Sequence, residues 1–106
     1  MEKVIKGKLY DTEKSELVAK NSIFNFFISK EEIIEELYKT KKGEYFLYSF
    51  VINAISRHEV GGKLGENIKV LNLSQILKWY EKKQKDFSDE EKSKFLKEFG
   101  KFFIEA

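Results

Sequence analysis

Apolar and polar residues alternate along much of the first seventy positions, which is the period of a β-strand. The clearest example is residues 36–50, where two runs of aromatic and aliphatic side chains flank Lys-Lys-Gly at 41–43. A three-residue hairpin loop places a residue in the left-handed backbone region, where glycine costs least. The pattern predicts a β-hairpin with arms at 36–40 and 44–50.

The second arm of this hairpin carries apolar side chains on both of its faces. Alternation separates two sets of three residues. One face holds Tyr45, Leu47 and Ser49, and the other holds Phe46, Tyr48 and Phe50. The arm is therefore expected to be covered on both sides, or covered on one side and offered to a partner on the other.

Three further segments have the composition of strands. Residues 3–11 form a short run with Val4, Ile5, Leu9 and Tyr10 that predicts a strand, and residues 15–23 predict a strand returning from it. Asp and Thr side chains at 11–14 can bond their own nearby backbone, which favours a turn there. Residues 67–73 alternate again and predict another strand.

Two connecting segments show no clear period. Residues 24–36 fit a helical turn capped by Ser29 or a strand through Ile33 and Ile34, and we favour an irregular connection that enters a strand near Ile34. Residues 51–66 contain several glycines and predict a loop, with a loop that includes one helical turn as the alternative.

The period changes to that of a helix after residue 72. Apolar residues recur at helical spacing from Leu73 to Tyr80, and Ser74 or Asn72 can cap this helix. Ser88 followed by Glu91 forms a capping box for a second helix. Its apolar stripe predicts a face in the core, with a partner helix as the alternative; the stripe comprises Phe95, Leu96, Phe99, Phe102 and Phe103.

These elements predict one α+β domain over residues 1–106. The sheet-forming part is expected at about 3–72 and the helical part at about 73–104. The predicted fold is an antiparallel sheet of about four or five strands with the C-terminal helices packed on one face.

Composition narrows the function classes. The net charge is +2, from 20 basic and 18 acidic residues interspersed along the chain, which argues against a strongly basic nucleic-acid binder and against an acidic DNA mimic. The sequence has no cysteine, so disulfides and thiolate metal sites are excluded. No signal peptide or long apolar run is visible, and a cytoplasmic protein without a membrane partner is expected.

No residue pattern indicates catalysis. His58, the only histidine, is not part of a recognisable catalytic motif and is expected to be an exposed loop residue. The GGKLG segment at 61–65 lacks the Ser or Thr of a phosphate loop and is expected to be a flexible loop. The glutamates at 31–36 lack the spacing of a metal site and predict a solvated face. We expect no enzymatic activity, metal or cofactor.

The hairpin tip is the strongest candidate for binding. Lys39, Lys41 and Lys42 lie beside three tyrosines, Tyr38, Tyr45 and Tyr48. Basic residues interleaved with aromatic ones can hold single-stranded nucleic acid through phosphate contacts and base stacking. The alternative is a lysine-tipped hairpin whose charges protect an edge strand from aggregation.

Three segments, KGKLYDTEKSELVAK, ELYKTKKGEYFLY and AISRHE, appear in this order. Together they resemble a family of small proteins carried by bacterial phages and integrative mobile elements. Members of that family have a GKxYDTExAE segment followed by an LY(K/R)TKxGx(W/Y)FL hairpin, and this chain resembles them in both. The family tends to place Gly-Glu-Gly-Gly after the hairpin, where this chain has Ser-Phe-Val-Ile at 49–52.

The resemblance implies a mobile-element inhibitor of a host defence effector, similar to anti-CRISPR proteins. The implied partner is a Cas effector or its guide-RNA complex, blocked by steric protein–protein contact, with RNA contact as a further expectation. The residues expected to bind it are Tyr38, Lys39, Lys41, Lys42, Tyr45, Arg57 and His58. The alternative hypothesis is a nucleic-acid-binding or homo-oligomeric accessory protein of a mobile element, including a homodimer.

Overall fold

The computed structural model describes residues 1–25, 31–53 and 63–106. Its centre is a four-stranded antiparallel sheet in which consecutive strands are neighbours, in the order β3-β4-β5-β6. These strands are β3 (Glu16–Asn25), β4 (Glu31–Lys39), β5 (Tyr45–Asn53) and β6 (Lys63–Leu71). Together with two C-terminal helices they confirm the predicted α+β class.

A separate two-stranded hairpin precedes the main sheet. It consists of β1 (Glu2–Ile5) and β2 (Lys8–Asp11), which pair in antiparallel fashion. The prediction of a single strand over this segment is wrong, because Lys6 (φ 51°) and Gly7 (φ 77°) both adopt positive φ and form a two-residue turn. Such a turn matches the twist of its flanking strands. The short 3₁₀ helix η1 (Thr12–Lys14) then supplies the turn that was expected there.

Strand β4 is longer than its sequence pattern predicted. It begins at Glu31, whereas an irregular connection was expected up to about Ile34. It pairs with β3 on one side and with β5 on the other. The pairing with β5 runs from Glu31 opposite Asn53 to Lys39 opposite Tyr45. Pairing with a neighbouring strand on each side overrides the weak local preference.

The glycine-rich segment is partly strand. β5 continues to Asn53 and β6 begins at Lys63, so the prediction of a loop across 51–66 is wrong at both ends. Gly65 has φ +58° and lies near a register shift between Ser49 and Val51, which marks a bulge. The rest of the predicted loop, residues 54–62, lies outside the described residues.

Two helices follow the sheet, as predicted. Helix α1 (Leu73–Lys83) begins with a complete capping box between Asn72 and Gln75, and the 3₁₀ helix η2 (Gln84–Asp86) follows it. In helix α2 (Asp89–Phe99), the Ser88 side chain accepts a hydrogen bond from the Glu91 N–H. The 3₁₀ helix η3 (Gly100–Phe102) ends the ordered helical part.

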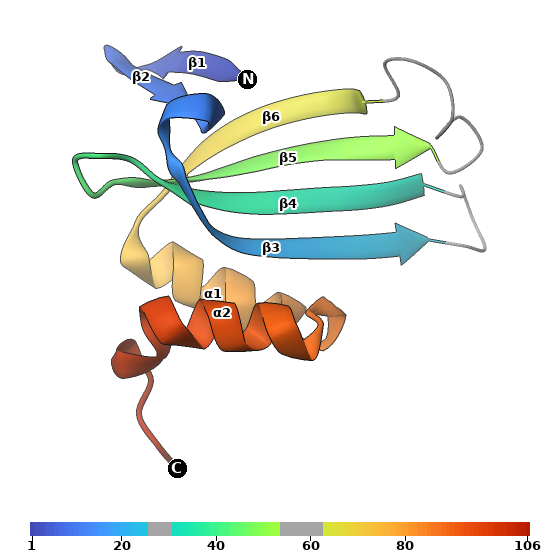
Figure 1. The fold of residues 1–106 in the computed structure, drawn as a ribbon, viewed down its shortest axis with the longest axis vertical. Coiled ribbons are helices and arrows are strands. Elements are labelled where there is room, and N and C mark those ends of the chain that lie inside the picture. Colours follow the sequence, from blue (N-terminus) through green and yellow to red (C-terminus); the bar gives the residue numbers. More distant parts are fainter. Residues whose placement is uncertain (26–30, 54–62) are drawn as a thin grey trace.

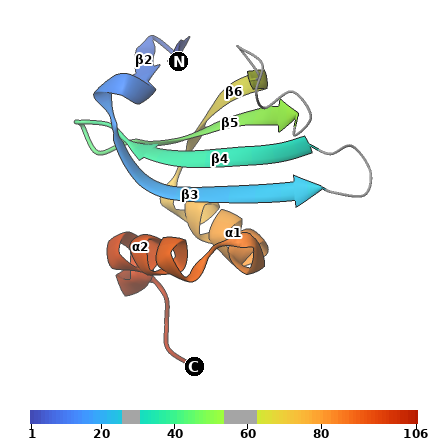
Figure 2. The same cartoon turned by 45° about the vertical axis from the view of Figure 1, so that its right-hand side comes forward.

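The helices cover one face of the sheet, and the N-terminal hairpin lies on the other (Figures 1 and 2). The helix-side core joins sheet residues such as Leu37 to helix residues such as Ile76. Phe95 and Phe99 are fully buried there, whereas the rest of the predicted apolar stripe is at the surface, namely Leu96, Phe102 and Phe103. The last two lie in or beyond η3, where the period of the α-helix has ended.

Strand β5 is covered on both sides, which is the first of the two predicted arrangements. Tyr45 and Leu47 pack against the helix-side core. Phe46 and Tyr48 lie in a second core together with Tyr10 of β2. The two cores explain why both faces of this strand are apolar.

Candidate functional site: the hairpin tip

The predicted tip is a closed turn. The Thr40 N–H donates to the Glu44 carbonyl oxygen (2.8 Å) and the Gly43 N–H donates to the Thr40 carbonyl oxygen (2.9 Å). The Glu44 N–H also donates to Thr40 Oγ1 (3.1 Å). Gly43 has φ +87°, as expected for glycine at this position. These bonds leave Lys41 and Lys42 exposed at the apex.

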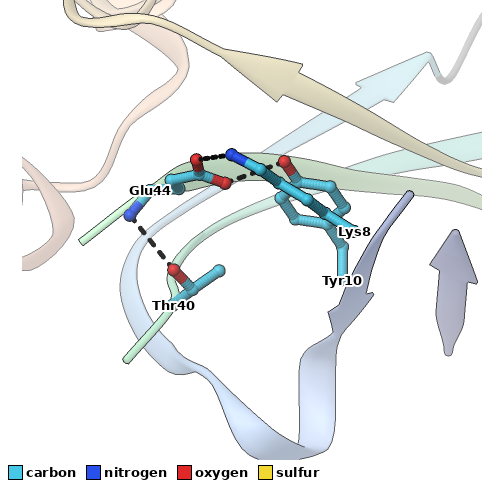
Figure 3. A network of polar contacts seen from close by, with 4 residues as sticks. All are labelled: Lys8, Tyr10, Thr40 and Glu44. Carbon is cyan, nitrogen blue, oxygen red and sulfur yellow. Dashed lines mark hydrogen bonds and ion pairs between the residues drawn. The ribbon is translucent and has the colours of Figure 1, made fainter. Parts of the chain in front are cut away.

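The N-terminal hairpin holds the base of this turn. Lys8 Nζ and Tyr10 Oη both donate to the carboxylate of Glu44, the second at 2.8 Å, and Figure 3 shows both side chains pointing at it. The Tyr10 ring also meets Phe46 edge to face, with centroids 5.6 Å apart. Two hydrogen bonds and one aromatic contact therefore fix the tip relative to β2.

The charges at this junction stabilise one another. Hydrogen bonds from Lys8 and Tyr10 hold the pKa of the Glu44 carboxyl below its ordinary value. The hydrogen bond to Glu44 raises the pKa of Lys8. Burial, followed by the same carboxylate, raises the pKa of Tyr10. Glu44 is thus ionised and fully engaged at neutral pH.

A cleft of 440 Å³ lies between β2, η1 and the hairpin tip, and we call it the tip cleft. Its charged lining residues are Lys8, Lys14, Lys41, Lys42, Asp11 and Glu44. Asp11 is 8% exposed and accepts a hydrogen bond from the Glu13 N–H (3.0 Å). Glu44 accepts hydrogen bonds from Lys8 and Tyr10. Both carboxylates of the tip cleft are therefore satisfied within the protein.

Three lysines of the tip cleft form no direct bond with a carboxylate, although the charge of Lys42 helps to lower the pKa of the Glu44 carboxyl. Lys14, Lys41 and Lys42 are exposed and form no ion pair or hydrogen bond with the described part of the chain. A second hollow of 490 Å³ adjoins the tip and shares Lys14, Ser15, Thr40 and Lys41 with the tip cleft. This hollow is of mixed charge, because Glu13 and Glu16 also line it. The positive charge is therefore concentrated in the tip cleft itself, where the described lining has four lysines against two carboxylates, and this cleft suits an anionic partner group.

Tyr38, one of the predicted contact residues, is engaged inside the protein. Its ring stacks on Phe46 with centroids 5.3 Å apart and an interplanar angle of 14°. Its hydroxyl donates to Glu36 Oε1 (2.9 Å). Burial and this carboxylate raise the pKa of Tyr38. The side chain faces the second core and not the apex of the hairpin.

Lys39 and Tyr45 lie on the opposite face and are tied to helix α2. Lys39 Nζ (3.2 Å) and Tyr45 Oη (3.1 Å) both donate to Glu98 Oε1. The Tyr45 ring packs on Phe99, with centroids 5.2 Å apart. The hydrogen bond to Glu98 raises the pKa of Lys39, whereas burial is the main cause of the raised pKa of Tyr45. These residues anchor the hairpin to the helices.

The structure thus separates the residues that the sequence grouped. Lys41 and Lys42 share the apex, while Tyr38 and the Lys39–Tyr45 pair lie on opposite faces of the sheet. Arg57 and His58 lie outside the described residues. Lys8, Tyr10 and Lys14 were missed, because their place at the tip depends on a hairpin turn at Lys6-Gly7 that has no strong sequence signature.

Comparisons with known proteins give no relative: no family model, curated protein or solved structure matches the chain. Within residues 1–25, 31–53 and 63–106, no helix is long and apolar enough to cross a membrane. The same residues contain no group of three or more His, Asp or Glu side chains arranged to hold a metal ion.

Proposed function

We propose that this protein acts by binding, as a phage or mobile-element inhibitor of a host defence effector, and most specifically as an anti-CRISPR protein that blocks a Cas nuclease complex by steric contact. The observation that carries the proposal is the tip cleft, whose described lining holds four lysines and two carboxylates, both of which are hydrogen-bonded within the protein. The motif resemblance supplies the class of partner.

The tip is suited to such contact because it is held in one geometry before binding. Glu44 is bonded to the N-terminal hairpin on one side of the tip, and Glu98 bonds Lys39 and Tyr45 on the other. A preorganised surface loses less conformational entropy on association than a mobile loop does. Lys14, Lys41 and Lys42 then meet negative charge on the effector surface or on the phosphates of its guide.

The test combines purified protein with reconstituted Cas effectors, with and without guide RNA, and follows target cleavage and co-elution. The expected result is a stable complex and loss of cleavage with at least one effector. Lys41→Glu combined with Lys42→Glu should weaken this complex strongly, because charge reversal places repulsion at the contact. The absence of a complex with every effector would refute the inhibitor proposal.

A matched control variant reverses the same number of lysine charges at a site away from the hairpin tip. Lys85→Glu combined with Lys94→Glu reverses two exposed lysines of the helical layer and should leave binding unchanged. Tyr45 is left intact in both variants because it packs on Phe99 and its removal would disturb the fold. Equal inhibition by the tip variant and the control would show that the tip is not the binding surface.

Binding to bare nucleic acid is the competing outcome. The same unpaired lysines could meet a phosphate backbone, and affinity would then fall steeply with salt concentration as counterions are released. A gel shift with guide RNA alone that disappears at raised salt, without any effector complex, would favour the nucleic-acid-binding alternative.

A further inference from the structure

A row of polar residues crosses the helix-covered face of the sheet. In register from one edge strand to the other, Asn21 pairs with Glu35, Glu35 with Ser49, and Ser49 with Asn67. The next row towards the hairpin tip is mainly apolar and includes Leu37 and Leu47. A polar row under a layer of helices needs hydrogen-bond partners, because buried polar groups are rarely left unpaired.

Only some of these polar groups have hydrogen-bond partners within the described part of the protein. Asn21 Nδ2 donates to Glu35 Oε1 (3.1 Å), and Lys83 Nζ lies 3.6 Å from the same oxygen. Asn21 is 2% exposed, yet its Oδ1 has no partner. Trp79, which is 9% exposed, has an indole Nε1 that likewise lacks an acceptor. Two buried polar atoms at this level are therefore unsatisfied.

An open cleft of 440 Å³ begins at this polar row and runs between the sheet and helix α1, and we call it the α1 cleft. Helix α1 contributes residues at i, i+3, i+4 and i+7, which share one face: Gln75, Lys78, Trp79 and Lys82. The sheet contributes the polar residues Glu35, Ser49, Asn67 and Lys69 and the apolar residues Leu47 and Leu71. The volume is in the range of small-molecule sites.

The charge of the α1 cleft is positive. Lys69, Lys78 and Lys82 line it from two sides and form no ion pair with the described residues. Among the described residues of the lining, Glu35 is the only carboxylate, and it already has Lys83 and Asn21 as partners. The lining therefore combines an apolar wall, neutral polar groups and three available cations.

We propose that the α1 cleft binds a small organic anion with a flat apolar body and a carboxylate or phosphate head group. The body lies against Trp79 and the neighbouring leucines, and the head group receives charge-assisted hydrogen bonds from Lys78 and Lys82. This site is distinct from the tip cleft and shares no lining residue with it.

The position of Trp79 makes the proposal directly testable. It is the single tryptophan of the chain, so it gives one fluorescence signal and one indole N–H resonance. The probes are phenyl phosphate and benzoate, which carry a phosphate and a carboxylate head group on an aromatic ring. The controls are inorganic phosphate, which is a head group alone, and benzyl alcohol, which is an aromatic body without a charged head group. We expect at least one of the two probes to give a saturable shift of the Trp79 indole resonance. Inorganic phosphate and benzyl alcohol should each give a much smaller shift.

Paired variants separate this site from general attraction of anions. Lys78→Gln combined with Lys82→Gln should weaken probe binding by about tenfold or more, since each charged hydrogen bond contributes measurably to affinity. Lys41→Gln combined with Lys42→Gln removes the same charge at the tip and should leave binding unchanged. No saturable shift, equal weakening in both variants, or an equal response to inorganic phosphate would overturn the proposal.

Discussion

The hydroxyl of Tyr10 donates to Glu44 Oε2 at 2.8 Å across a separation of 34 residues. This contact joins the two-stranded N-terminal hairpin to the base of the β4–β5 turn. Because Lys8 bonds the other oxygen of the same carboxylate, Glu44 links two elements that have no shared backbone ladder. The shape of the tip cleft depends on this junction.

Removal of the Tyr10 ring should undock the N-terminal hairpin. Tyr10 is 4% exposed and its ring meets Phe46, so Tyr10→Ala is expected to lower the free energy of unfolding by about 3 kcal/mol. Leu9→Ala, one residue away on the outer face and 52% exposed, is the control and should cost about 0.5 kcal/mol. Urea unfolding of both variants measures the difference, and equal losses would show that the Tyr10 contact does not hold the hairpin.

Acid should loosen the same junction. The pKa of Glu44 is lowered in the folded state, so its contribution to stability is complete above the ordinary glutamate pKa and is lost as the pH falls through the lower folded value. The pKa of Lys8 is raised, so its contribution is lost only at strongly alkaline pH. We expect the junction to be intact at neutral pH and to weaken below about pH 4.

The measurement is the urea midpoint as a function of pH for the protein and for Glu44→Gln. The variant lacks the titrating carboxylate, so its midpoint should fall less between about pH 5 and pH 3. Glu105→Gln, which alters an exposed carboxylate near the C-terminus, is the control and should follow the unmodified protein. Parallel curves for all three proteins would contradict the assigned role of Glu44.

Two glycines should respond in opposite directions to the same substitution. Gly43 has φ +87°, a conformation that L-residues adopt only with strain, so Gly43→Ala should lower the free energy of unfolding by about 1–2 kcal/mol. Gly100 has φ −56°, and an added Cβ would lie 3.7 Å from Leu96 Cβ, an ordinary contact. Gly100→Ala should therefore stabilise the protein by about 0.5–1 kcal/mol. Thermal unfolding decides both signs, and the same sign for both would contradict the described backbone.

The phenylalanines of the C-terminal part should separate into two classes. Phe99 is fully buried, and Phe99→Ala is expected to cost about 3–5 kcal/mol through the cavity that it leaves. Phe102 is 44% exposed, and the same truncation there should cost about 0.5 kcal/mol. Denaturant unfolding measures both. A large loss at Phe102 would indicate that it is covered in solution, for example by a second copy of the chain.

Local chemistry explains why the central hairpin was predictable. Residues 41–43 carry the glycine that the turn requires, and the flanking residues alternate on both arms, so sequence and structure agree on the tip and on the two faces of β5. The helix starts were predictable for the same reason, because a cap such as Asn72 acts on its own next turn.

Contacts between distant residues account for the parts that were not predictable. The contact of Tyr10 with Glu44 depends on a turn in which Lys6 adopts φ 51°, and lysine gives no sequence signal for that conformation. Leu64 lies in a strand because it pairs with Val51, although its glycine neighbours favour a loop. Both sites therefore needed the three-dimensional arrangement, since each combines elements that are far apart in the sequence.

The order of the strands also has a consequence for how the molecule assembles. Each strand of the main sheet pairs with its neighbour in sequence, so the sheet can grow by successive short-range closures, which favours rapid folding. The Tyr10–Glu44 contact spans 34 residues and requires the tip to exist already. Lys8 and Lys14 therefore join Lys41 and Lys42 only after the β4–β5 turn has closed, and a nascent chain that ends before this turn does not yet present the charged surface that the finished protein offers to a partner.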